Sequence, residues 1–163
     1  MAWLKRVPRW LLEVLVVVVL LWAVHAYQAR ELAQGAAPEF TLSDLDGGVW
    51  TRARLSGKPT LVVFWAPWCG VCRAMGSNVS YVKALSGDGA QVISIASDYR
   101  SVDEVRRYAA EHQLDYPVLL GARDAARAFH VRAYPTVFVL DESGQIRSSM
   151  VGYATTLGMY LRL

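Results

Sequence analysis

The chain has 163 residues, 54% of them apolar and 19% charged, with a formal net charge of +3. This length suits one globular domain with a hydrophobic core. No basic stripe with interleaved aromatic residues is present, which argues against a nucleic-acid partner.

Residues 10–27 form an apolar stretch whose only ionisable members, Glu13 and His25, lie near its ends. As a helix rising about 1.5 Å per residue, it would reach roughly 27 Å, close to the thickness of a hydrocarbon core. We therefore predict a transmembrane anchor over residues 10–27. A cleaved signal peptide with a site near residues 24–26 is the alternative.

The charges around this stretch predict its orientation. Basic residues precede it at Lys5, Arg6 and Arg9, whereas only Arg30 closely follows it. The positive-inside rule then puts residues 1–9 in the cytoplasm and the rest of the chain outside it. Whether the stretch is an anchor or a cleaved signal peptide, the domain is predicted to be exported from the cytoplasm.

The segment after the anchor has two parts. Residues 28–36 carry no clear period and read as a linker, so the domain is predicted to span residues 37–163. Residues 38–50 alternate, turn at Asp46-Gly47-Gly48 and resume, which indicates a β-hairpin.

The remaining chain alternates between strand and helix patterns. The predicted strands are residues 60–65, 91–96, 116–120, 136–140 and 145–151. Helices are predicted over residues 71–85, from Ser101 with Glu104 as its capping-box partner, over 122–129 and over 155–163. This order predicts an α/β layered fold.

The only two cysteines, Cys69 and Cys72, stand two residues apart directly after the buried strand 60–65. If a helix begins there, its unpaired N–H groups and dipole favour a thiolate at Cys69. We interpret the pair as a redox centre. A structural disulfide, a metal site and two buried small side chains are the alternatives.

Metal and haem chemistry fit the pair less well. Zinc needs four ligands, and His25, His112 and His130 are scattered along the chain. A c-type haem needs a histidine where Arg73 stands. We predict no cofactor and no metal, and keep a membrane-tethered copper(I)-binding module as the non-enzymatic alternative. A redox assay with a copper titration separates the two.

Two motifs carry a family resemblance. The run Trp65-Ala66-Pro67-Trp68-Cys69-Gly70-Val71-Cys72 and the later Tyr134-Pro135-Thr136 resemble the active-site motif and the cis-proline segment of the thioredoxin superfamily. The resemblance implies a central mixed sheet flanked by helices. It also implies that Cys69 is an exposed nucleophile, that Cys72 is the resolving thiol and that Pro135 is cis.

Substrate contacts follow from the same motifs. A cis Pro135 would leave the backbone of Tyr134 free to pair with an extended substrate. Trp68, next to Cys69, is the predicted aromatic contact, whereas Trp65 on the buried strand is predicted to pack in the core. The expected partners are protein dithiols or disulfides.

A narrower resemblance suggests a subfamily and a cellular location. Residues 37–42 and 91–120 are similar to the TlpA-like branch of membrane-tethered bacterial thioredoxins. The single anchor with Cys-Gly-Val-Cys looks most like the suppressor-of-copper-sensitivity protein D type. This implies a single-pass protein of the bacterial inner membrane with a periplasmic domain, a membrane electron donor or acceptor, and a role in copper tolerance or cytochrome c maturation.

The chain departs from the family pattern near the second cysteine. Val63 stands where thioredoxin keeps a buried aspartate, and residues 74–76 lack the glutamate of many TlpA-like reductases. His130 replaces the usual glycine before the cis-proline segment. Cys72 therefore has no carboxylate from either position to take up its proton.

The sequence around the cysteines also predicts the reduction potential of the Cys69–Cys72 couple. Val71, unlike the proline of thioredoxin, keeps an N–H, so the amides of Val71 and Cys72 could both face the Cys69 sulfur. Removal of the aspartate charge also favours the thiolate. A stabilised thiolate makes the couple more oxidising. Equilibration with glutathione buffers should give a potential above that of thioredoxin. A value as low as roughly −270 mV would contradict the prediction.

Overall fold

In the computed structural model of the protein, the described residues are 8–30 and 32–163, and the side chains of residues 21, 22, 24–30 and 122 lie outside the description. The chain forms two units, Met1–Glu31 and Leu32–Leu163. The first contains helix α1 (Arg9–Arg30). Most of the predicted cytoplasmic segment, residues 1–7, lies outside the described residues.

Helix α1 covers the predicted anchor and continues to Arg30, three residues beyond its predicted end. Within residues 8–30 and 32–163, no helix is long and apolar enough to cross a membrane. The structure thus does not show the membrane-spanning helix predicted over residues 10–27.

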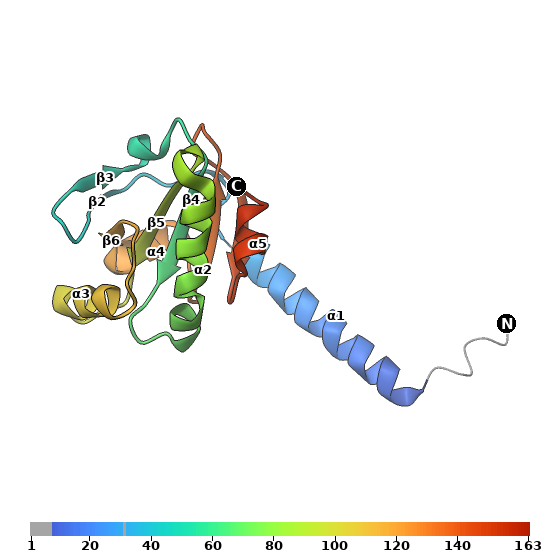
Figure 1. The fold of residues 1–163 in the computed structure, drawn as a ribbon. Helices are drawn as coiled ribbons and strands as arrows, with labels where there is room; N and C mark the ends of the chain where they lie inside the picture. Colours follow the sequence, from blue (N-terminus) through green and yellow to red (C-terminus); the bar gives the residue numbers. More distant parts are fainter. Residues whose placement is uncertain (1–7, 31) are drawn as a thin grey trace. The chain divides into compact units, whose positions relative to one another are not determined.

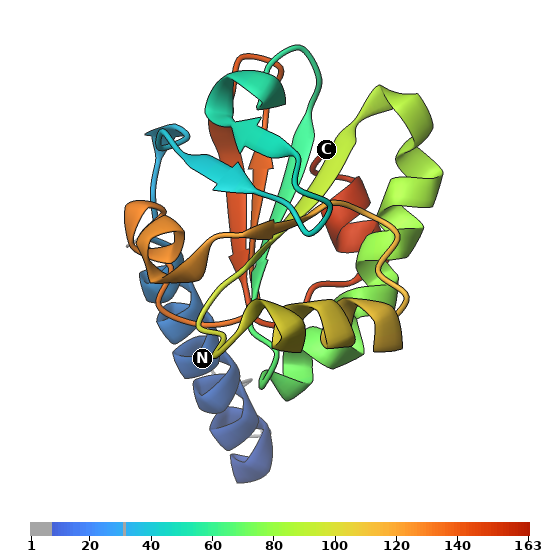
Figure 2. The same ribbon diagram turned by 90° about the vertical axis from the view of Figure 1, so that its left-hand side faces the viewer.

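The second unit is built on a mixed sheet (Figures 1 and 2). Within residues 32–163 the sheet has six strands in the order β1-β8-β7-β4-β5-β6. Strands β4, β5 and β6 run parallel, and β7, β8 and β1 join by antiparallel pairing. The strand bounds are β1 Gly35–Ala36, β4 Thr60–Trp65, β5 Gln91–Ala96, β6 Val118–Leu120, β7 Thr136–Leu140 and β8 Gln145–Val151.

Strand β4 lies in the middle of this sheet because every one of its residues can be buried. All six are apolar or β-branched, and all six are buried in the structure. Trp65 pairs with Ala96 of β5 at the carboxyl end of both strands. The chain leaves β4 at that edge and enters the cysteine motif.

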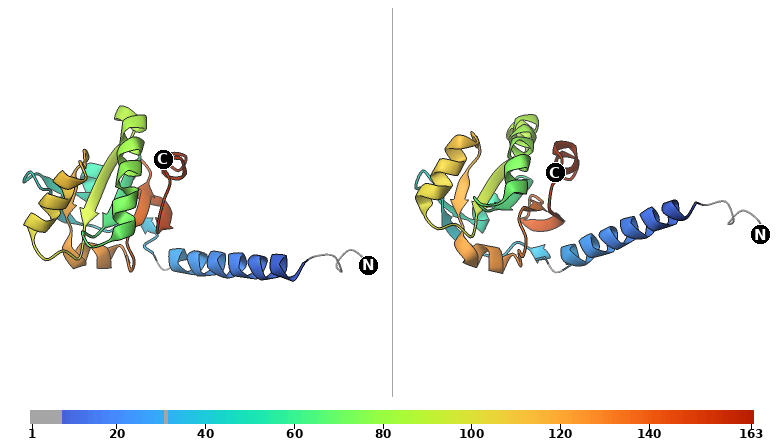
Figure 3. Two further views of the ribbon diagram at one scale, coloured as in Figure 1. Left: turned by 60° about the horizontal axis from the view of Figure 1, so that its bottom comes forward. Right: turned by 90° about the horizontal axis from the view of Figure 1, so that it is seen from below.

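Helices cover both faces of the sheet (Figure 3). On one face, α2 (Gly70–Ser86) and α5 (Thr156–Tyr160) pack over Leu61, Val63 and Val137. On the other, α4 (Ala122–Ala128) packs over a second cluster. That cluster contains the rings of Phe64, Phe129 and Phe138, whose centroids lie 5.0 to 5.8 Å apart.

The predicted hairpin is present as β2 (Thr41–Ser43) and β3 (Val49–Thr51). Asp44 closes its turn by accepting the N–H groups of Asp46 and Gly48 and the indole N–H of Trp50. These bonds lower the pKa of the Asp44 carboxyl, with the Trp50 bond as the largest cause. The hairpin docks on the sheet edge through the Leu45 N–H, which donates to the Val118 carbonyl at 3.1 Å.

The domain begins earlier than the sequence indicated. Residues 32–36 belong to the predicted linker, yet Leu32 is buried in the core and β1 pairs with β8. Two-residue strands leave no alternation to detect in a sequence. Their backbone pairing comes from the tertiary structure alone.

The third helix, α3 (Val102–Glu111), begins as predicted at Ser101, whose hydroxyl accepts the Glu104 N–H at 3.2 Å. Glu104 reaches back to the N–H of Arg100 at 2.8 Å instead of the Ser101 N–H expected of a capping box. Short 3₁₀ turns at η2 (Arg52–Leu55) and η3 (Gly87–Gly89) complete the connections. The predicted α/β fold with a mixed sheet and flanking helices is confirmed.

Candidate active site

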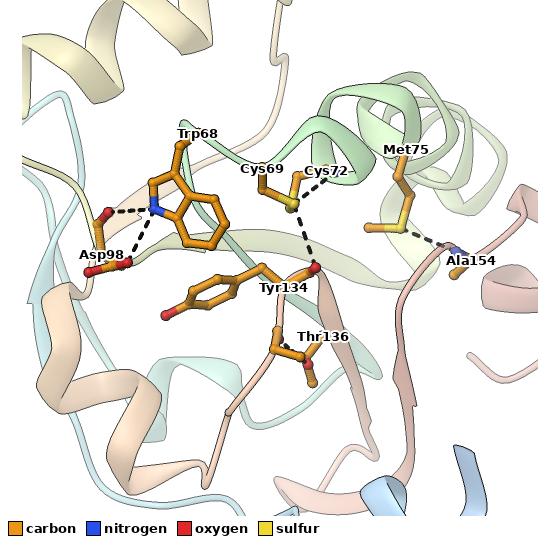
Figure 4. Close-up of a disulfide and its surroundings, with 9 residues drawn as sticks. Trp68, Cys69, Cys72, Met75, Asp98, Tyr134, Thr136 and Ala154 are labelled. Carbon is orange, nitrogen blue, oxygen red and sulfur yellow. Dashed lines mark hydrogen bonds between the residues drawn. A yellow bond between two sulfur atoms is a disulfide. The ribbon is translucent and has the colours of Figure 1, made fainter. Parts of the chain in front are cut away.

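The two cysteines form a disulfide at the start of α2, where the chain leaves β4 (Figure 4). Their Cα atoms are 5.2 Å apart. Cys69 is the N-cap residue, and its sulfur accepts the N–H of Cys72 at 3.1 Å. The sulfur that caps the helix is therefore the one closest to the positive end of its dipole.

The expected second amide contact is missing. Among the hydrogen bonds of the described residues, Cys72 donates to the Cys69 sulfur, and Val71 does not. In the disulfide form the cap is made by the N–H three residues after Cys69, which is the usual partner of an N-cap side chain. The direct contribution predicted for Val71 is not seen in this state.

Both cysteines are buried in the disulfide form. Cys69 is 5% exposed and Cys72 4% exposed, so the expectation of an exposed nucleophile is wrong for this state. The disulfide holds the Cys69 sulfur toward Cys72, and the carbonyl oxygen of Tyr134 lies 3.6 Å from it. In the disulfide this sulfur carries no proton; once reduced, its thiol could donate to that oxygen.

The loop facing the disulfide contains the cis peptide bond between Tyr134 and Pro135. Pro135 accepts the N–H of Gly152 at 2.8 Å, and the Thr136 hydroxyl donates to the Ala133 carbonyl at 2.8 Å. Within the described part of the chain, no hydrogen bond is donated by the Tyr134 N–H. The residue whose carbonyl approaches the Cys69 sulfur thus also carries a backbone donor without a partner among the described residues.

His130 has a definite backbone role. Its φ of 55° is left-handed, and it follows Phe129, the C-cap residue of α4. The His130 N–H donates to the Arg127 carbonyl and the Val131 N–H to the Ala126 carbonyl. This pair of bonds is a Schellman motif, which explains why a glycine is common at the position. The motif turns the chain from α4 toward the cis-proline loop.

Trp68 lies beside the disulfide, and the residue is 61% exposed. Its indole N–H donates to the backbone oxygen of Asp98 at 3.1 Å and to Asp98 Oδ2 at 3.2 Å (Figure 4). Asp98 Oδ1 accepts Nε and Nη2 of Arg123 at 3.2 and 3.1 Å. One carboxylate therefore ties Trp68 to α4. The indole also meets the Tyr134 ring edge to face at 5.9 Å.

The surroundings of Cys72 hold no carboxylate among their described residues. A small cavity of about 10 Å³ lies beside it, lined by Val63, Trp65, Cys72, Met75, Gly76, Val79, Tyr108, Leu114 and Tyr116. Burial raises the pKa of Tyr108 and of Tyr116, so both phenols stay protonated at neutral pH. Neither can act as a base for the Cys72 thiol.

The structure brings all five predicted site residues together. They are Cys69, Cys72, Trp68, Tyr134 and Pro135. Trp65 packs in the core against Tyr108, with ring centroids 4.3 Å apart, and Met75 is buried. Sequence reasoning missed Asp98 and Arg123. A usable signal was present, because Asp98 follows β5, and the carboxyl ends of parallel strands meet at one edge.

Within residues 8–30 and 32–163, no group of three or more His, Cys, Asp or Glu side chains could hold a metal ion. The chemistry that the site offers is the making and breaking of the Cys69–Cys72 bond. A sulfur capping a helix, next to an unpaired backbone donor and an exposed aromatic ring, suits exchange of that bond with a protein disulfide. The chain is a thioredoxin-like protein disulfide oxidoreductase.

Comparison with known proteins narrows the assignment. The sequence model of the AhpC/TSA family matches residues 33–149, and the chain belongs to this family. The thioredoxin-like protein YneN of Bacillus subtilis is 31% identical over 129 residues, which cover 78% of this chain and 76% of that protein. The thiol-disulfide oxidoreductase ResA of Geobacillus thermodenitrificans is 26% identical over 73% of this chain and 69% of its own length.

A solved structure of a related protein has the same fold. The thiol:disulfide interchange protein of Chlorobium tepidum superimposes with a TM-score of 0.70 at 27% identity, covering 80% of this chain and 94% of that one. The superfamily resemblance seen in the sequence is confirmed by these relatives.

The bonds of Asp98 predict the order of the Trp68 ring. Asp98→Gly removes the side-chain acceptor without strain at its φ of 50°. The order parameter of the Trp68 indole N–H should then fall from a rigid value near 0.85 toward about 0.6, measured by nitrogen relaxation. Asp98→Asn keeps an oxygen acceptor, tolerates the same backbone and should stay near the rigid value. The buried Trp65 indole is the internal control. Equal order in both variants would contradict the prediction.

Proposed function

We propose that the protein exchanges disulfides with protein substrates through Cys69 as the attacking thiol and Cys72 as the resolving thiol. The observation that carries this assignment is the hydrogen bond from the Cys72 N–H to the Cys69 sulfur at 3.1 Å. It stabilises negative charge on Cys69 and not on Cys72. The two sulfurs therefore have different roles although both are buried.

The exchange proceeds in two steps. In the reduced protein, the Cys69 thiolate attacks a substrate disulfide, forms a mixed disulfide and releases one substrate thiolate. Cys72 then loses its proton and attacks the Cys69 sulfur, which releases the second substrate thiol and forms the Cys69–Cys72 bond. The reverse sequence oxidises a substrate dithiol. The cavity beside Cys72 lacks a carboxylate, so the proton of the Cys72 thiol passes to solvent or to the departing thiolate. The lack of a nearby base slows the second step.

The cis-proline loop is the proposed binding surface for the substrate backbone. The Tyr134 N–H, unpaired within the described chain, would donate to a carbonyl of an extended segment beside the substrate cysteine. Trp68, held by Asp98, would cover the apolar part of that segment. Both groups flank the Cys69 sulfur, so one substrate can contact all three.

We further propose that residues 10–27 anchor the domain to a bacterial inner membrane and that the domain works in the periplasm. The support is the sequence of that stretch and the basic residues Lys5, Arg6 and Arg9 before it. In this setting the protein would act as a TlpA-like enzyme with a membrane electron partner, in the manner of the suppressor-of-copper-sensitivity protein D type.

The two-step exchange predicts a covalent trap. Cys72→Ala leaves Cys69 able to attack but removes the thiol that resolves the mixed disulfide. Expressed in cells, this variant should accumulate substrate proteins linked through Cys69 and released by dithiothreitol. The matched control is Cys69→Ala with Cys72→Ala, which should trap none. Absence of linked proteins in the single variant would contradict the proposed function.

The proposed location predicts protease accessibility. In spheroplasts of a bacterial host, added protease should degrade the domain while a cytoplasmic marker survives, and the domain should sediment with membranes. Replacing Val16 and Val18 by Asp puts two carboxylates into the apolar stretch, at a cost of about 2.5 to 3.5 kcal/mol each near a bilayer centre. That variant should leave the membrane fraction. Protection of the wild-type domain in spheroplasts would contradict the periplasmic location.

A further inference from the structure

The cavity beside Cys72 has the size of a single water molecule. Its volume is about 10 Å³, at the lower limit of the space that one buried water needs. A buried water also needs two or more polar partners. Polar groups are carried by four of the residues that line the cavity, which are Trp65, Cys72, Tyr108 and Tyr116. The cavity therefore has the size and the neighbours of a water site.

The Trp65 indole gives independent support for a water site. Trp65 is 4% exposed, and its indole N–H is buried with no hydrogen-bond partner among the described residues. A buried donor without a partner is costly in free energy, and buried waters typically bond to groups of this kind. Because Trp65 lines the cavity, a water there can accept its N–H.

Gly76 leaves room for the cavity. It lies inside α2, where glycine favours the helix less than alanine does. Apart from its chain neighbours and the helix backbone, a Cβ atom at this position would have only the Leu114 side chain within 4 Å, at 3.8 Å. Gly76 and Leu114 both line the cavity. A methyl group at position 76 would therefore take up space beside Cys72 without a clash.

Tyr108 connects this cavity to the surface. It is 7% exposed, and among the described residues it alone lines both the cavity and a surface cleft of about 270 Å³. Its ring stacks on the Trp65 ring with centroids 4.3 Å apart and meets the His112 ring edge to face at 4.3 Å. The lining of the cleft comprises Pro67, Arg73, Glu104, Arg107, Tyr108, Glu111 and His112.

We propose that the Tyr108 hydroxyl, together with one water molecule in the cavity, carries the proton of Cys72 between the buried thiol and the surface cleft. The proposal rests on the disulfide exchange proposed above and adds a proton-transfer residue to its second step. The water accepts the Trp65 N–H and the Cys72 thiol, and it donates to the Tyr108 oxygen.

The proton moves in one concerted chain. When Cys72 attacks the Cys69 sulfur, the water takes the thiol proton and passes one of its own to Tyr108, which releases its hydroxyl proton to solvent in the cleft. One proton leaves the protein, and the water and the phenol end as they began. In the reverse reaction the same route returns a proton to the Cys72 thiolate as it leaves the disulfide.

The charges around the two phenols favour Tyr108 over Tyr116 for this transfer, because a phenol that passes on a proton gains negative charge for a moment. Burial raises the pKa of Tyr108, and the positive charge of Arg73 opposes that rise. Burial also raises the pKa of Tyr116, and Tyr108 and Asp115 add to the rise. Tyr108 is neutral before and after the transfer, so it serves as a carrier and not as a base.

The test follows the two steps of exchange separately, in the reduced full chain kept in neutral detergent. The protein is mixed with the disulfide dimer of a short uncharged peptide, concentrated enough for the mixed disulfide to accumulate, and the reaction is quenched with acid at increasing times. Mass spectrometry then quantifies reduced protein, mixed disulfide and oxidised protein. The first rate constant describes attack by Cys69, and the second describes attack by Cys72 on the mixed disulfide.

Tyr108→Phe removes the hydroxyl and keeps the ring. At neutral pH we expect the second rate constant to fall by about tenfold to a hundredfold, up to the low end of the range for a positioned proton-transfer group, while the first stays within about twofold. Tyr116→Phe removes the same atom from the other phenol and is the matched control, so it should keep both rate constants.

Gly76→Ala tests the water. Its methyl group should displace the water and lower the second rate constant as Tyr108→Phe does, with the first rate constant kept. Because alanine favours the helix more than glycine, a weaker fold would not explain that loss. An unchanged second rate constant in Gly76→Ala would overturn the part assigned to the water.

The pH profile separates proton transfer from a structural effect. Well above the usual cysteine pKa of about 8.5, Cys72 loses its proton before it attacks, so the second rate constant of Tyr108→Phe should approach the wild-type value. A deficit that is equal at every pH, no deficit at neutral pH, or an equal loss in Tyr116→Phe would overturn the role of Tyr108, while oxidation of the protein by the peptide keeps the exchange function. Failure of the peptide disulfide to oxidise the wild-type protein would overturn both proposals.

Discussion

The hydrogen bond from the Cys72 amide to the Cys69 sulfur is the contact on which the chemistry of this protein depends. It makes a sulfur atom the N-cap of α2, so the reactive group is held by the same interaction that starts the helix. The rest of the domain supplies the conditions for it. Strand β4 is buried on both faces and delivers Cys69 to the edge of the sheet, where α2 can begin without competing backbone pairing.

A second backbone feature positions the cis-proline loop, which forms the other side of the site. The Schellman motif at the end of α4 uses His130 in a left-handed conformation and redirects the chain into the loop of Tyr134 and Pro135. That loop joins β7, the antiparallel neighbour of β4. Because β4 and β7 are paired, the loop before β7 necessarily lies beside the residues that follow β4. The sheet register therefore sets the 3.6 Å approach of Tyr134 to Cys69.

Asp98 links the site to its surroundings. It follows β5, the parallel neighbour of β4, and divides its two carboxylate oxygens between Trp68 and Arg123. The arrangement holds an exposed aromatic ring beside the disulfide and ties it to Arg123 of α4. The two sulfurs have different environments: Cys69 lies near the Cys72 N–H and the Tyr134 carbonyl, whereas the pocket beside Cys72 is lined by apolar groups and neutral phenols and holds no carboxylate.

The sequence by itself determined the elements that depend on local pattern. The β-branched run over residues 60–65, the Ser101 cap and the hairpin turn each follow from steric and hydrogen-bonding preferences of neighbouring residues. The five predicted site residues also came from short motifs. Tertiary structure decided whatever depends on pairing between distant segments: β1 is too short to show a period, and the burial of Cys69 needs the cis-proline loop above it. The partners of Asp98 come together only when β5, α4 and the cysteine motif meet at one edge of the sheet, because no local rule relates residues 68, 98 and 123.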